Sequence, residues 1–250
     1  MHKGINLSII IPNFNSGSLL DHTLASIFFK EIIFTFEVLI IDNLSIDNPR
    51  QYIDNYPEGS IVYISEQDIG IYDAMNKGVK LASGRWLFFL GAGDELIIDA
   101  VNQIKFNQYK NSTLIYANTQ LLKNGKVYDG EFDLLKLMKR NISHQAIFYN
   151  LSVFNEIGYF DTNFKITADY IFNLKIFMRT TVEIHYLPIV VSRFLGGGLS
   201  DDLRDDFFQN NKLKIINKLV LSNFIWENLC ALVSYDFYYL KNYLKLKIGQ

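Results

Sequence analysis

The first hundred residues alternate between short β-type runs and helix-type segments, and this order constrains the fold more than any other feature. Two of the runs, residues 36–41 and 86–90, are mainly apolar, as expected of parallel strands that are covered on both faces. The other runs are residues 7–11 and 60–64, and the helix-type segments are residues 18–28, 47–56 and 71–82. The alternation predicts an α/β domain with a mostly parallel central sheet and helices on both faces, which binds its ligand beyond the carboxyl ends of the strands.

Polar residues follow each of these runs, at the point where the predicted strand ends. They lie in residues 12–15, 42–43, 66–68 and 91–95. Asp73, Asn76 and Lys77 follow on a helix whose start points to the same edge of the sheet. Because the carboxyl ends of parallel strands meet at one edge, these segments together predict a binding site for a polar ligand.

The run at residues 86–90 leads into two adjacent carboxylates, Asp94 and Glu95. Gly91 and Gly93 let the backbone turn sharply before them and keep side chains away from a ligand. The segment is not a dinucleotide fingerprint, because Leu96 stands where the last glycine is needed, and the chain has no Walker lysine motif. Either Asp94 caps a helix that starts near Glu95, or it holds a metal or a phosphate-bearing ligand. The other polar loops favour the ligand.

Other polar residues are also open to two interpretations. Asp42 and Asn43 either form a turn or accept hydrogen bonds from a nucleotide. Asp169 either caps an apolar helix or, raised in basicity by partial burial, acts as a general base. His144 is more often a satisfied polar core residue than a ligand, and a place in the lining of a pocket is the alternative.

Beyond residue 100 the pattern is mixed. It predicts strands at 113–119 and 120–128, with Asn124-Gly125 as a hairpin turn signal between short flanks. It also predicts a strand at 143–148, one or two strands at 181–193, where Pro188 interrupts, a helix at 168–178, and helical structure from residue 201.

Composition excludes several classes of protein. A formal net charge of −2 gives no electrostatic footprint for nucleic acid. The single Cys230 excludes an internal disulfide framework and a cysteine-based zinc site. No signal peptide opens the sequence, and no apolar run approaches the roughly 18 residues that span a bilayer. We therefore expect a cytoplasmic protein, with peripheral contact at the inner face of the cell membrane left open.

Five segments resemble the family 2 glycosyltransferases of the GT-A fold, in particular the bacterial enzymes that build capsule and O-antigen. They are LSIIIPNFNSGSLLDHTLASI, FEVLIIDNLSID, SEQDIGIYDAMNKGVKLASGRWLFFLGAGDEL, SHQAIFY and FDTNFKITADYIFNLKI. The resemblance runs in order over residues 5–200. It implies a Rossmann-like GT-A domain over residues 1–205, followed by a helical C-terminal extension over residues 206–250.

The resemblance also implies roles for single residues. Asp169 would be the catalytic base and Asp94 the metal ligand, with Glu95 as a helper, and Pro12, Asn13, Phe14 and Asp42 would border the nucleotide. From their place in the polar segments, we also expect Asn43, Asp73 and Lys77 to bind the nucleotide and His144 to lie on the acceptor side. Gly93 and Asn43 stand where many members have Asp, which weakens the metal site and leaves the nucleotide open.

The implied activity is an inverting transfer of a sugar from a nucleoside-diphosphate sugar to a hydroxyl of a glycan or lipid-linked acceptor, assisted by Mg²⁺ or Mn²⁺. Two alternatives stay open. A glycoside hydrolase would use two carboxylates and leave the nucleotide-binding loops unexplained. A nucleotide-sugar-binding subunit that has lost catalysis is compatible with Gly93.

Residues 211–250 combine lysines with Trp226 and a tyrosine-rich stretch at 235–243. Basic residues beside aromatic ones are typical of a helix that lies on an anionic membrane surface. The alternatives are that these helices pack on the GT-A domain or on a second subunit of a homodimer.

Overall fold

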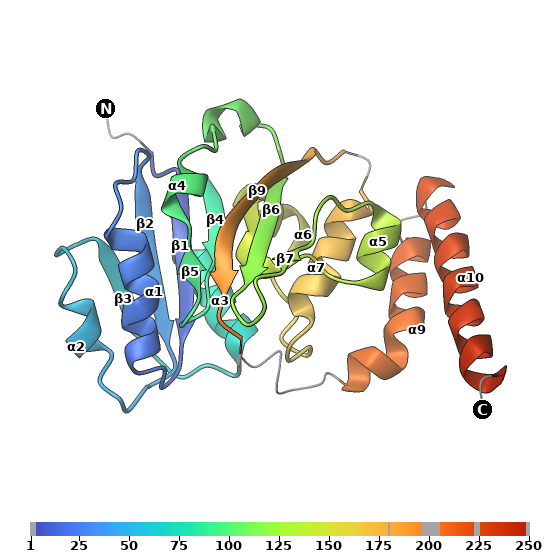
Figure 1. The fold of residues 1–250 in the computed structure, drawn as a ribbon, viewed down its shortest axis with the longest axis horizontal. Coiled ribbons are helices and arrows are strands. Elements are labelled where there is room, and N and C mark those ends of the chain that lie inside the picture. Colours follow the sequence, from blue (N-terminus) through green and yellow to red (C-terminus); the bar gives the residue numbers. More distant parts are fainter. Residues whose placement is uncertain (1–3, 180, 197–205, 223–225, 249–250) are drawn as a thin grey trace.

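The computed structural model describes residues 4–179, 181–196, 206–222 and 226–248, and it contains one nine-stranded mixed sheet flanked by helices (Figure 1). The strand order is β3-β2-β1-β4-β8-β6-β9-β5, and β7 pairs with β6 at the side. The predicted α/β architecture, with a mostly parallel sheet at its amino-terminal end, is therefore confirmed.

The first half of the sheet consists of parallel strands with helices on both faces. The strands are β1 (Leu7–Asn13), β2 (Phe36–Asp42), β3 (Ile61–Ser65) and β4 (Trp86–Phe89). Successive residues of β1 face opposite sides, as the strand period requires. Ile10 packs in the cluster that contains helix α3 (Ile71–Leu81), whereas Ile9 and Ile11 pack in the cluster that contains α1 (Ser18–Phe28).

The second half adds antiparallel pairs. Strand β8 (Ile147–Asn150) lies antiparallel between β4 and β6 (Leu114–Leu121), and β9 (Ile184–Phe194) runs parallel to β6. Strand β5 (Glu95–Leu96) pairs antiparallel with the end of β9. The remaining elements are α4 (Ile98–Val101), η1 (Phe106–Tyr109), β7 (Val127–Tyr128), α5 (Leu134–Lys139), η2 (His144–Ala146), α6 (Ser152–Ile157) and α7 (Ala168–Phe177).

Several predicted boundaries were wrong. The helix expected at 47–56 is reduced to α2 (Arg50–Ile53), because Pro49 disfavours a helical conformation at the residue before it, and Asn48 has φ 53°. Residues 143–148 begin with the short helix η2, and the strand starts only at Ile147. Pro188 does not divide residues 181–193. Strand β9 continues through it, with a register shift against β6 that accommodates a residue lacking an N–H donor.

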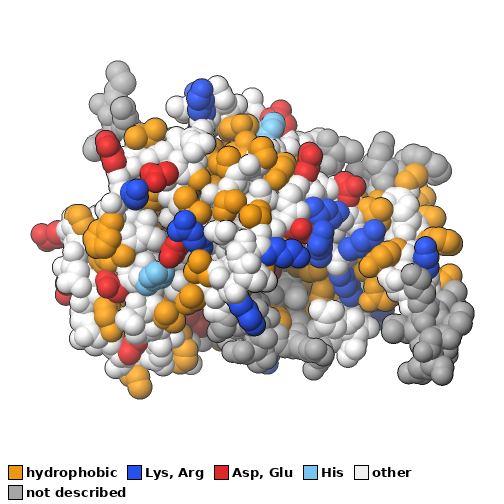
Figure 2. Space-filling model, in the orientation of Figure 1, with side chains coloured by type: hydrophobic (Ala, Val, Ile, Leu, Met, Phe, Trp, Pro, Cys, Tyr) orange, Lys and Arg blue, Asp and Glu red, His pale blue; other side chains and the backbone are white. Residues whose placement is uncertain are grey.

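The C-terminal helices α9 (Asp206–Ser222) and α10 (Trp226–Ile248) lie at the end of the molecule opposite α2 (Figure 1). Their inner faces bury Phe208, Ile216 and Tyr235 in the same core cluster as α3 and α7. Other apolar side chains of these helices, including Val233 and Phe237, are exposed, and hydrophobic side chains show at this end of the surface (Figure 2). Among the described residues, no helix is long and apolar enough to cross a membrane.

Candidate functional site

The first component of the site is a hydrogen-bonded pair at the carboxyl ends of β1 and β2. Asn13 stands in register with Asp42, and its Nδ2 donates to Asp42 Oδ1 at 2.6 Å. Asp42 is 0% exposed and also accepts hydrogen bonds from Ser45, Ser65 and Tyr63. Burial alone would raise the pKa of Asp42, but the hydrogen bonds from Ser45, Asn13 and Ser65 outweigh it and hold the pKa below its usual value. Asp42 is thus a buried anion that fixes the surrounding loops.

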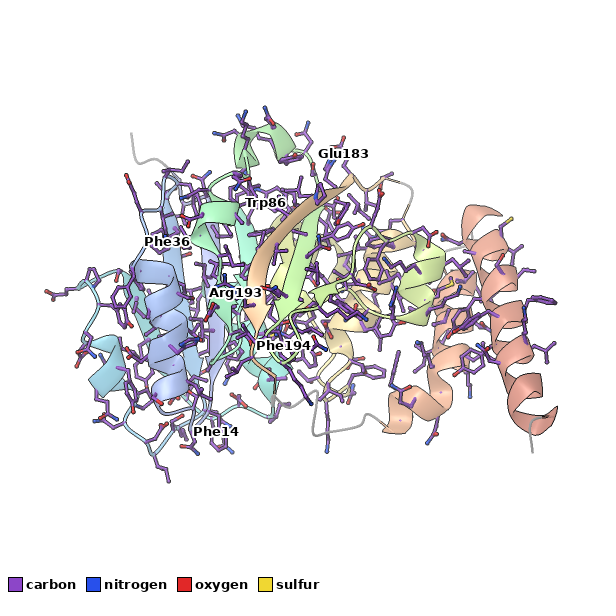
Figure 3. The ribbon with its side chains drawn as sticks, viewed as in Figure 1. Phe14, Phe36, Trp86, Glu183, Arg193 and Phe194 are labelled. Carbon is purple, nitrogen blue, oxygen red and sulfur yellow. The ribbon has the colours of Figure 1, made fainter. Side chains whose placement is uncertain are left out.

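Phe14 follows this pair and is 62% exposed at the strand ends (Figure 3). An exposed aromatic ring beside buried polar residues offers a flat surface on which a base could stack. Pro12 precedes the pair in β1 and is partly buried. Asn43 accepts a hydrogen bond from the backbone N–H of Asp68 at 2.9 Å, and so joins the loops that follow β2 and β3.

Asp73 and Lys77 lie in the first turns of α3, next to the same loops. Lys77 Nζ is 3.0 Å from Glu66 Oε1 and 3.7 Å from Asp73 Oδ2. The Lys77 side chain is largely covered, and its cation is held between two carboxylates. The structure thus places the predicted nucleotide-binding residues along one rim, from β1 to the start of α3.

Asp94 is the second component, and it does not cap a helix. The segment after it is strand β5, and α4 begins only at Ile98 with Ile97 as its N-cap. Asp94 is 4% exposed, and its Oδ1 and Oδ2 accept hydrogen bonds from Leu195 N at 3.0 Å and Gln145 Nε2 at 2.8 Å. Burial raises the pKa of Asp94, and the hydrogen bonds from Leu195 and Gln145 and the nearby His144 oppose that shift only in part.

The two glycines before Asp94 have separate roles. Gly93 has φ 101°, a conformation that L side chains rarely adopt. A Cβ at Gly91 would lie 2.9 Å from Asp94 Oδ2, so the carboxylate folds back over a position where a larger residue has no room. The predicted sharp turn is present, and the space beside Gly91 is taken by the Asp94 carboxylate itself.

The structure does not bring Glu95 to Asp94. Glu95 Oε1 is 3.0 Å from His22 Nε2, and Oε2 is 2.7 Å from Arg193 Nη1. Arg193 comes from β9, which pairs with β5 at this point (Figure 3). Both Glu95 oxygens are therefore held by basic side chains, and the arrangement gives no support to its predicted role as a metal helper.

Asp94 fits a divalent cation as a single protein ligand. A carboxylate has about four lone-pair sites, so the two hydrogen bonds leave it free to coordinate. The described part of the chain contains no group of three His, Cys, Asp or Glu residues arranged to hold a metal by themselves. A cation here would need oxygens from a substrate and from water, which is an ordinary arrangement for Mg²⁺.

Asp169 is the third component. It lies in the first turn of α7, where the N-cap position belongs to Thr167. Asp169 is 5% exposed, and each of its carboxylate oxygens has a neutral donor: Tyr72 OH at 2.6 Å on Oδ1 and Asn141 Nδ2 at 2.7 Å on Oδ2. The predicted burial is confirmed, and no basic side chain of the described ranges lies within 4.0 Å of this carboxylate.

A chain of hydrogen bonds continues from Asp169 into the core. Asn141 Oδ1 accepts from Asn173 at 2.9 Å, and Asn173 Oδ1 accepts from Tyr149 OH at 2.8 Å. Tyr149 is fully buried. The residues that hold Asp169 are thus themselves fixed, as is typical of a preorganised catalytic group.

Sequence reasoning missed the partners of both carboxylates. Tyr72, Asn141 and Gln145 stood in or beside the segments that we singled out, but no local pattern marks them as partners. His144, which we predicted on the acceptor side, lies half-buried in η2 near Asp94.

Comparison with solved structures defines the class of fold. TarS from S. aureus in complex with UDP-GlcNAc superposes with a TM-score of 0.77 and 17% identity, over 92% of this chain and 71% of that one. The mannosyltransferase PcManGT from Pyrobaculum calidifontis, in complex with GDP-Man and Mn²⁺, gives a TM-score of 0.65 and 12% identity over 95% and 70% of the chains. The fold is that of the GT-A glycosyltransferases.

Sequence comparison gives the family. Residues 8–163 match the glycosyl transferase family 2 profile. A PGL/p-HBAD biosynthesis glycosyltransferase from Mycobacterium bovis is 35% identical over 210 residues, which cover 80% of this chain and 81% of the relative. WfgD from Escherichia coli, named as UDP-Glc:alpha-D-GlcNAc-diphosphoundecaprenol beta-1,3-glucosyltransferase, is 25% identical over 97% of this chain and 93% of its own. The chain belongs to glycosyl transferase family 2.

Proposed function

We propose that this protein is an inverting glycosyltransferase that moves a sugar from a nucleoside-diphosphate sugar to a hydroxyl of a glycan or lipid-linked acceptor in surface polysaccharide synthesis. The observation that carries the proposal is Asp169, a buried carboxylate that neutral donors hold on both oxygens. The relatives support it, because they include a glucosyltransferase named for a diphosphoundecaprenol-linked acceptor.

Asp169 is the base of the proposed reaction. It takes the proton of the acceptor hydroxyl while the hydroxyl oxygen bonds to the anomeric carbon, and the bond to the nucleoside diphosphate breaks on the opposite side. One displacement inverts the configuration at that carbon. Tyr72 and Asn141 fix the direction of the carboxylate, so that little reorganisation is needed when the proton moves.

Asp94 is the residue that would hold Mg²⁺ or Mn²⁺. When bound, the cation supplies Lewis-acid stabilisation of the charge that builds on the leaving diphosphate. Because burial disfavours the charged form of Asp94, a cation beside it would also relieve an electrostatic cost of the fold. The Mn²⁺ bound together with GDP-Man in the PcManGT complex supports the same use of a metal in this class of fold.

The rim from β1 to α3 is the proposed nucleotide site. Phe14 supplies an exposed ring, and the Asn13–Asp42 pair fixes the loop that carries it. Lys77 adds a cation in the second turn of α3, shared with Glu66 and Asp73. The nucleotide sugars bound in the TarS and PcManGT complexes are the donor class that such a rim would take.

The test is Asp169→Asn, compared with wild type and with Asp54→Asn, an exposed aspartate at the end of α2. Removing a general base typically lowers the rate by about 10²- to 10⁴-fold, while contacts on the donor side remain. We expect Asp169→Asn to lose transfer to the acceptor but to bind the nucleoside diphosphate as wild type does in calorimetry.

Other results would contradict the proposal. Loss of nucleotide binding together with activity would give Asp169 a structural role. If the wild-type protein binds nucleotide sugars but transfers no sugar, it is a binding subunit. If it releases sugar from glycans in the absence of a nucleotide, it is a hydrolase.

A further inference from the structure

A cleft of about 410 Å³ lies between α5 and α10, outside the site described above. Its lining residues are Asp133, Leu135, Lys136, Lys139, Arg140 and Tyr238. Half of these side chains carry a positive charge, and Lys and Arg side chains gather on this part of the surface (Figure 2). The proposed reaction does not use any of them.

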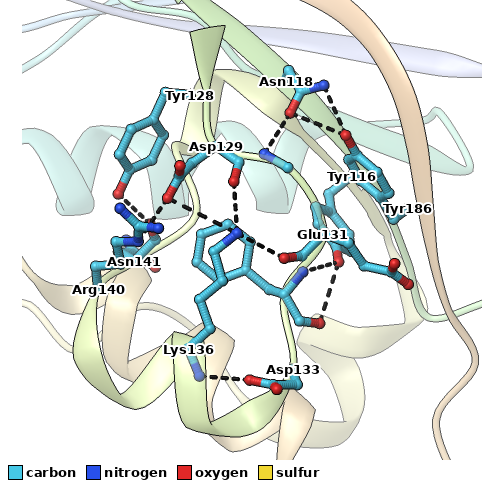
Figure 4. A network of polar contacts seen from close by, with 12 residues as sticks. Tyr116, Asn118, Tyr128, Asp129, Glu131, Asp133, Lys136, Arg140, Asn141 and Tyr186 are labelled. Atoms are coloured by element: carbon cyan, nitrogen blue, oxygen red, sulfur yellow. Dashed lines mark hydrogen bonds and ion pairs between the residues drawn. The ribbon is translucent and has the colours of Figure 1, made fainter.

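Two of these cations are already engaged with acidic or carbonyl groups. Arg140 Nε is 2.6 Å from Asp129 Oδ2, which leaves the other guanidinium donors available. Lys136 Nζ donates to the backbone carbonyls of Asp129 and Glu131 at 2.6 and 2.7 Å and so fastens the loop before α5 (Figure 4).

Lys139 and Lys212 differ from them. Lys139 Nζ lies 4.4 Å from the centre of the Tyr238 ring, and Lys212 Nζ donates to the Lys139 carbonyl at 2.9 Å. In the described ranges, neither lysine has a carboxylate within 4.0 Å. Burial lowers the pKa of Lys212 to about 8, and this lysine lies outside the lining of the cleft. Among the cations that line the cleft, the charge of Lys139 is therefore not neutralised by a carboxylate of the described residues.

One lining residue of the cleft, Arg140, is next in the chain to a residue that holds the proposed base. Asn141, which donates to Asp169, follows Arg140 directly in the chain, at a Cα–Cα spacing of about 3.8 Å. Tyr128 OH donates to the Asn141 carbonyl at 2.7 Å (Figure 4). Burial and the carboxylates of Asp129 and Asp169 raise the pKa of Tyr128, whereas Arg140 lowers it, so the Arg140 and Asp169 charges act on the same side chain.

We infer that the cleft between α5 and α10 binds the phosphate or diphosphate group of the acceptor through Lys139 and Arg140. This inference rests on the proposed function, because it places the charged end of the acceptor beside the base that activates its hydroxyl. Charge-assisted hydrogen bonds to phosphate are among the strong polar contacts of proteins, and the Tyr238 ring closes one side of the cleft.

The test is Lys139→Gln, with Lys80→Gln as a matched control. Lys80 also lies over a tyrosine ring, 5.4 Å from the centre of Tyr159, but on α3. Inorganic diphosphate is titrated into the full-length protein by calorimetry, with EDTA present. We expect Lys139→Gln to weaken binding about five- to tenfold and Lys80→Gln to leave it unchanged. With a glycosyl-diphosphoundecaprenol acceptor, Lys139→Gln should raise the acceptor KM by a similar factor and leave the donor KM unchanged.

Equal diphosphate affinity in wild type and Lys139→Gln would overturn the inference. If Lys139→Gln instead reduces only flotation with phosphatidylglycerol vesicles, the phosphate belongs to membrane headgroups, and the acceptor assignment is wrong. The two proposals fail separately. If diphosphate binding depends on Lys139 but the protein transfers no sugar, the proposed function is wrong. If the protein transfers sugar and Lys139→Gln leaves the acceptor KM unchanged, only this inference is wrong.

Discussion

At the scale of single residues, the two proposed catalytic carboxylates differ in how the protein holds them. Asp169 is held by side chains only, from α3 and from the loop after α5. Asp94 is held by one side chain and one backbone N–H, that of Leu195. Replacing Asp94 therefore also affects the end of β9, and a substitution that keeps its size and an acceptor oxygen is the informative one.

We predict that Asp94→Asn keeps the fold but loses the stabilisation that Mn²⁺ gives together with a nucleoside diphosphate. Burial raises the pKa of Asp94 in the folded protein above its value of 3.8 in the unfolded chain. The contribution of Asp94 to folding stability is therefore largest at a pH below 3.8, and it is lost as the pH rises through the pKa of the folded protein. At neutral pH a bound cation offsets the buried charge. Thermal shift should show a Mn²⁺-dependent increase in Tm for wild type at pH 7 that shrinks as the pH falls, and none for Asp94→Asn.

The control for this prediction is Asp99→Asn, an exposed carboxylate paired with Lys30 on the surface. It should retain the full Mn²⁺ effect. A Mn²⁺ effect of wild-type size in Asp94→Asn would place the metal elsewhere.

At the scale of elements, the backbone conformation of the turn between β4 and β5 determines where the Asp94 carboxylate lies. The chain changes direction at Gly93, which has a positive φ, and the Asp94 carboxylate lies over Gly91. The hydroxyl of Thr23 from α1 accepts a hydrogen bond from Gly93 N at 2.8 Å and donates to the Asp94 carbonyl at 2.9 Å. The position of Asp94 is thus set by its neighbours in the turn as well as by its own partners.

We predict that Gly91→Ala lowers turnover strongly with only a modest loss of stability. The added Cβ would lie 2.9 Å from Asp94 Oδ2 and must displace the carboxylate. Gly4→Ala is the control, because nothing lies within 4 Å of a Cβ there. Turnover and Tm are measured for both variants. If Gly91→Ala turns over as fast as Gly4→Ala, the position of Asp94 does not matter for the reaction.

The elements also show what sequence alone can predict. Periodicity and the order of apolar runs located β1 to β4, α1, α3 and α7, because each depends on residues close together in the chain. The site is different. Tyr72 and Asp169 are 97 residues apart, and Asp94 and Leu195 are 101 apart. The resemblance marked the carboxylates, but their partners are set by tertiary packing, which no local pattern encodes.

At the scale of the whole molecule, α9 and α10 have two different faces. Phe208 and Tyr235 are buried against the rest of the protein, which supports the packing interpretation for the inner face. Val233 is 63% and Phe237 70% exposed on the outer face. Exposed apolar side chains on helices that also carry lysines fit peripheral contact with an anionic membrane, where a lipid-linked acceptor would be found.

We predict that the protein floats with anionic vesicles at low salt and is released as salt is added, because screening weakens the attraction of its lysines. The double variant Val233→Ser, Phe237→Ser should float less, since it loses apolar surface that is not part of the core. Ile33→Ser is the control, because Ile33 is similarly exposed in the loop between α1 and β2. Protein that stays at the bottom of the gradient at every salt concentration would end the membrane hypothesis.

The bond between Asp94 and Leu195 has a consequence for the order in which the protein becomes functional during synthesis. Asn13, Asp42 and Lys77 all lie within the first 77 residues, whereas the Asp94 partners come from Gln145 and Leu195. Closing such distant contacts carries a loop-closure cost and comes late in folding. In a chain still emerging from the ribosome, Asp94 therefore lacks its Leu195 partner until the segment after β9 has been made.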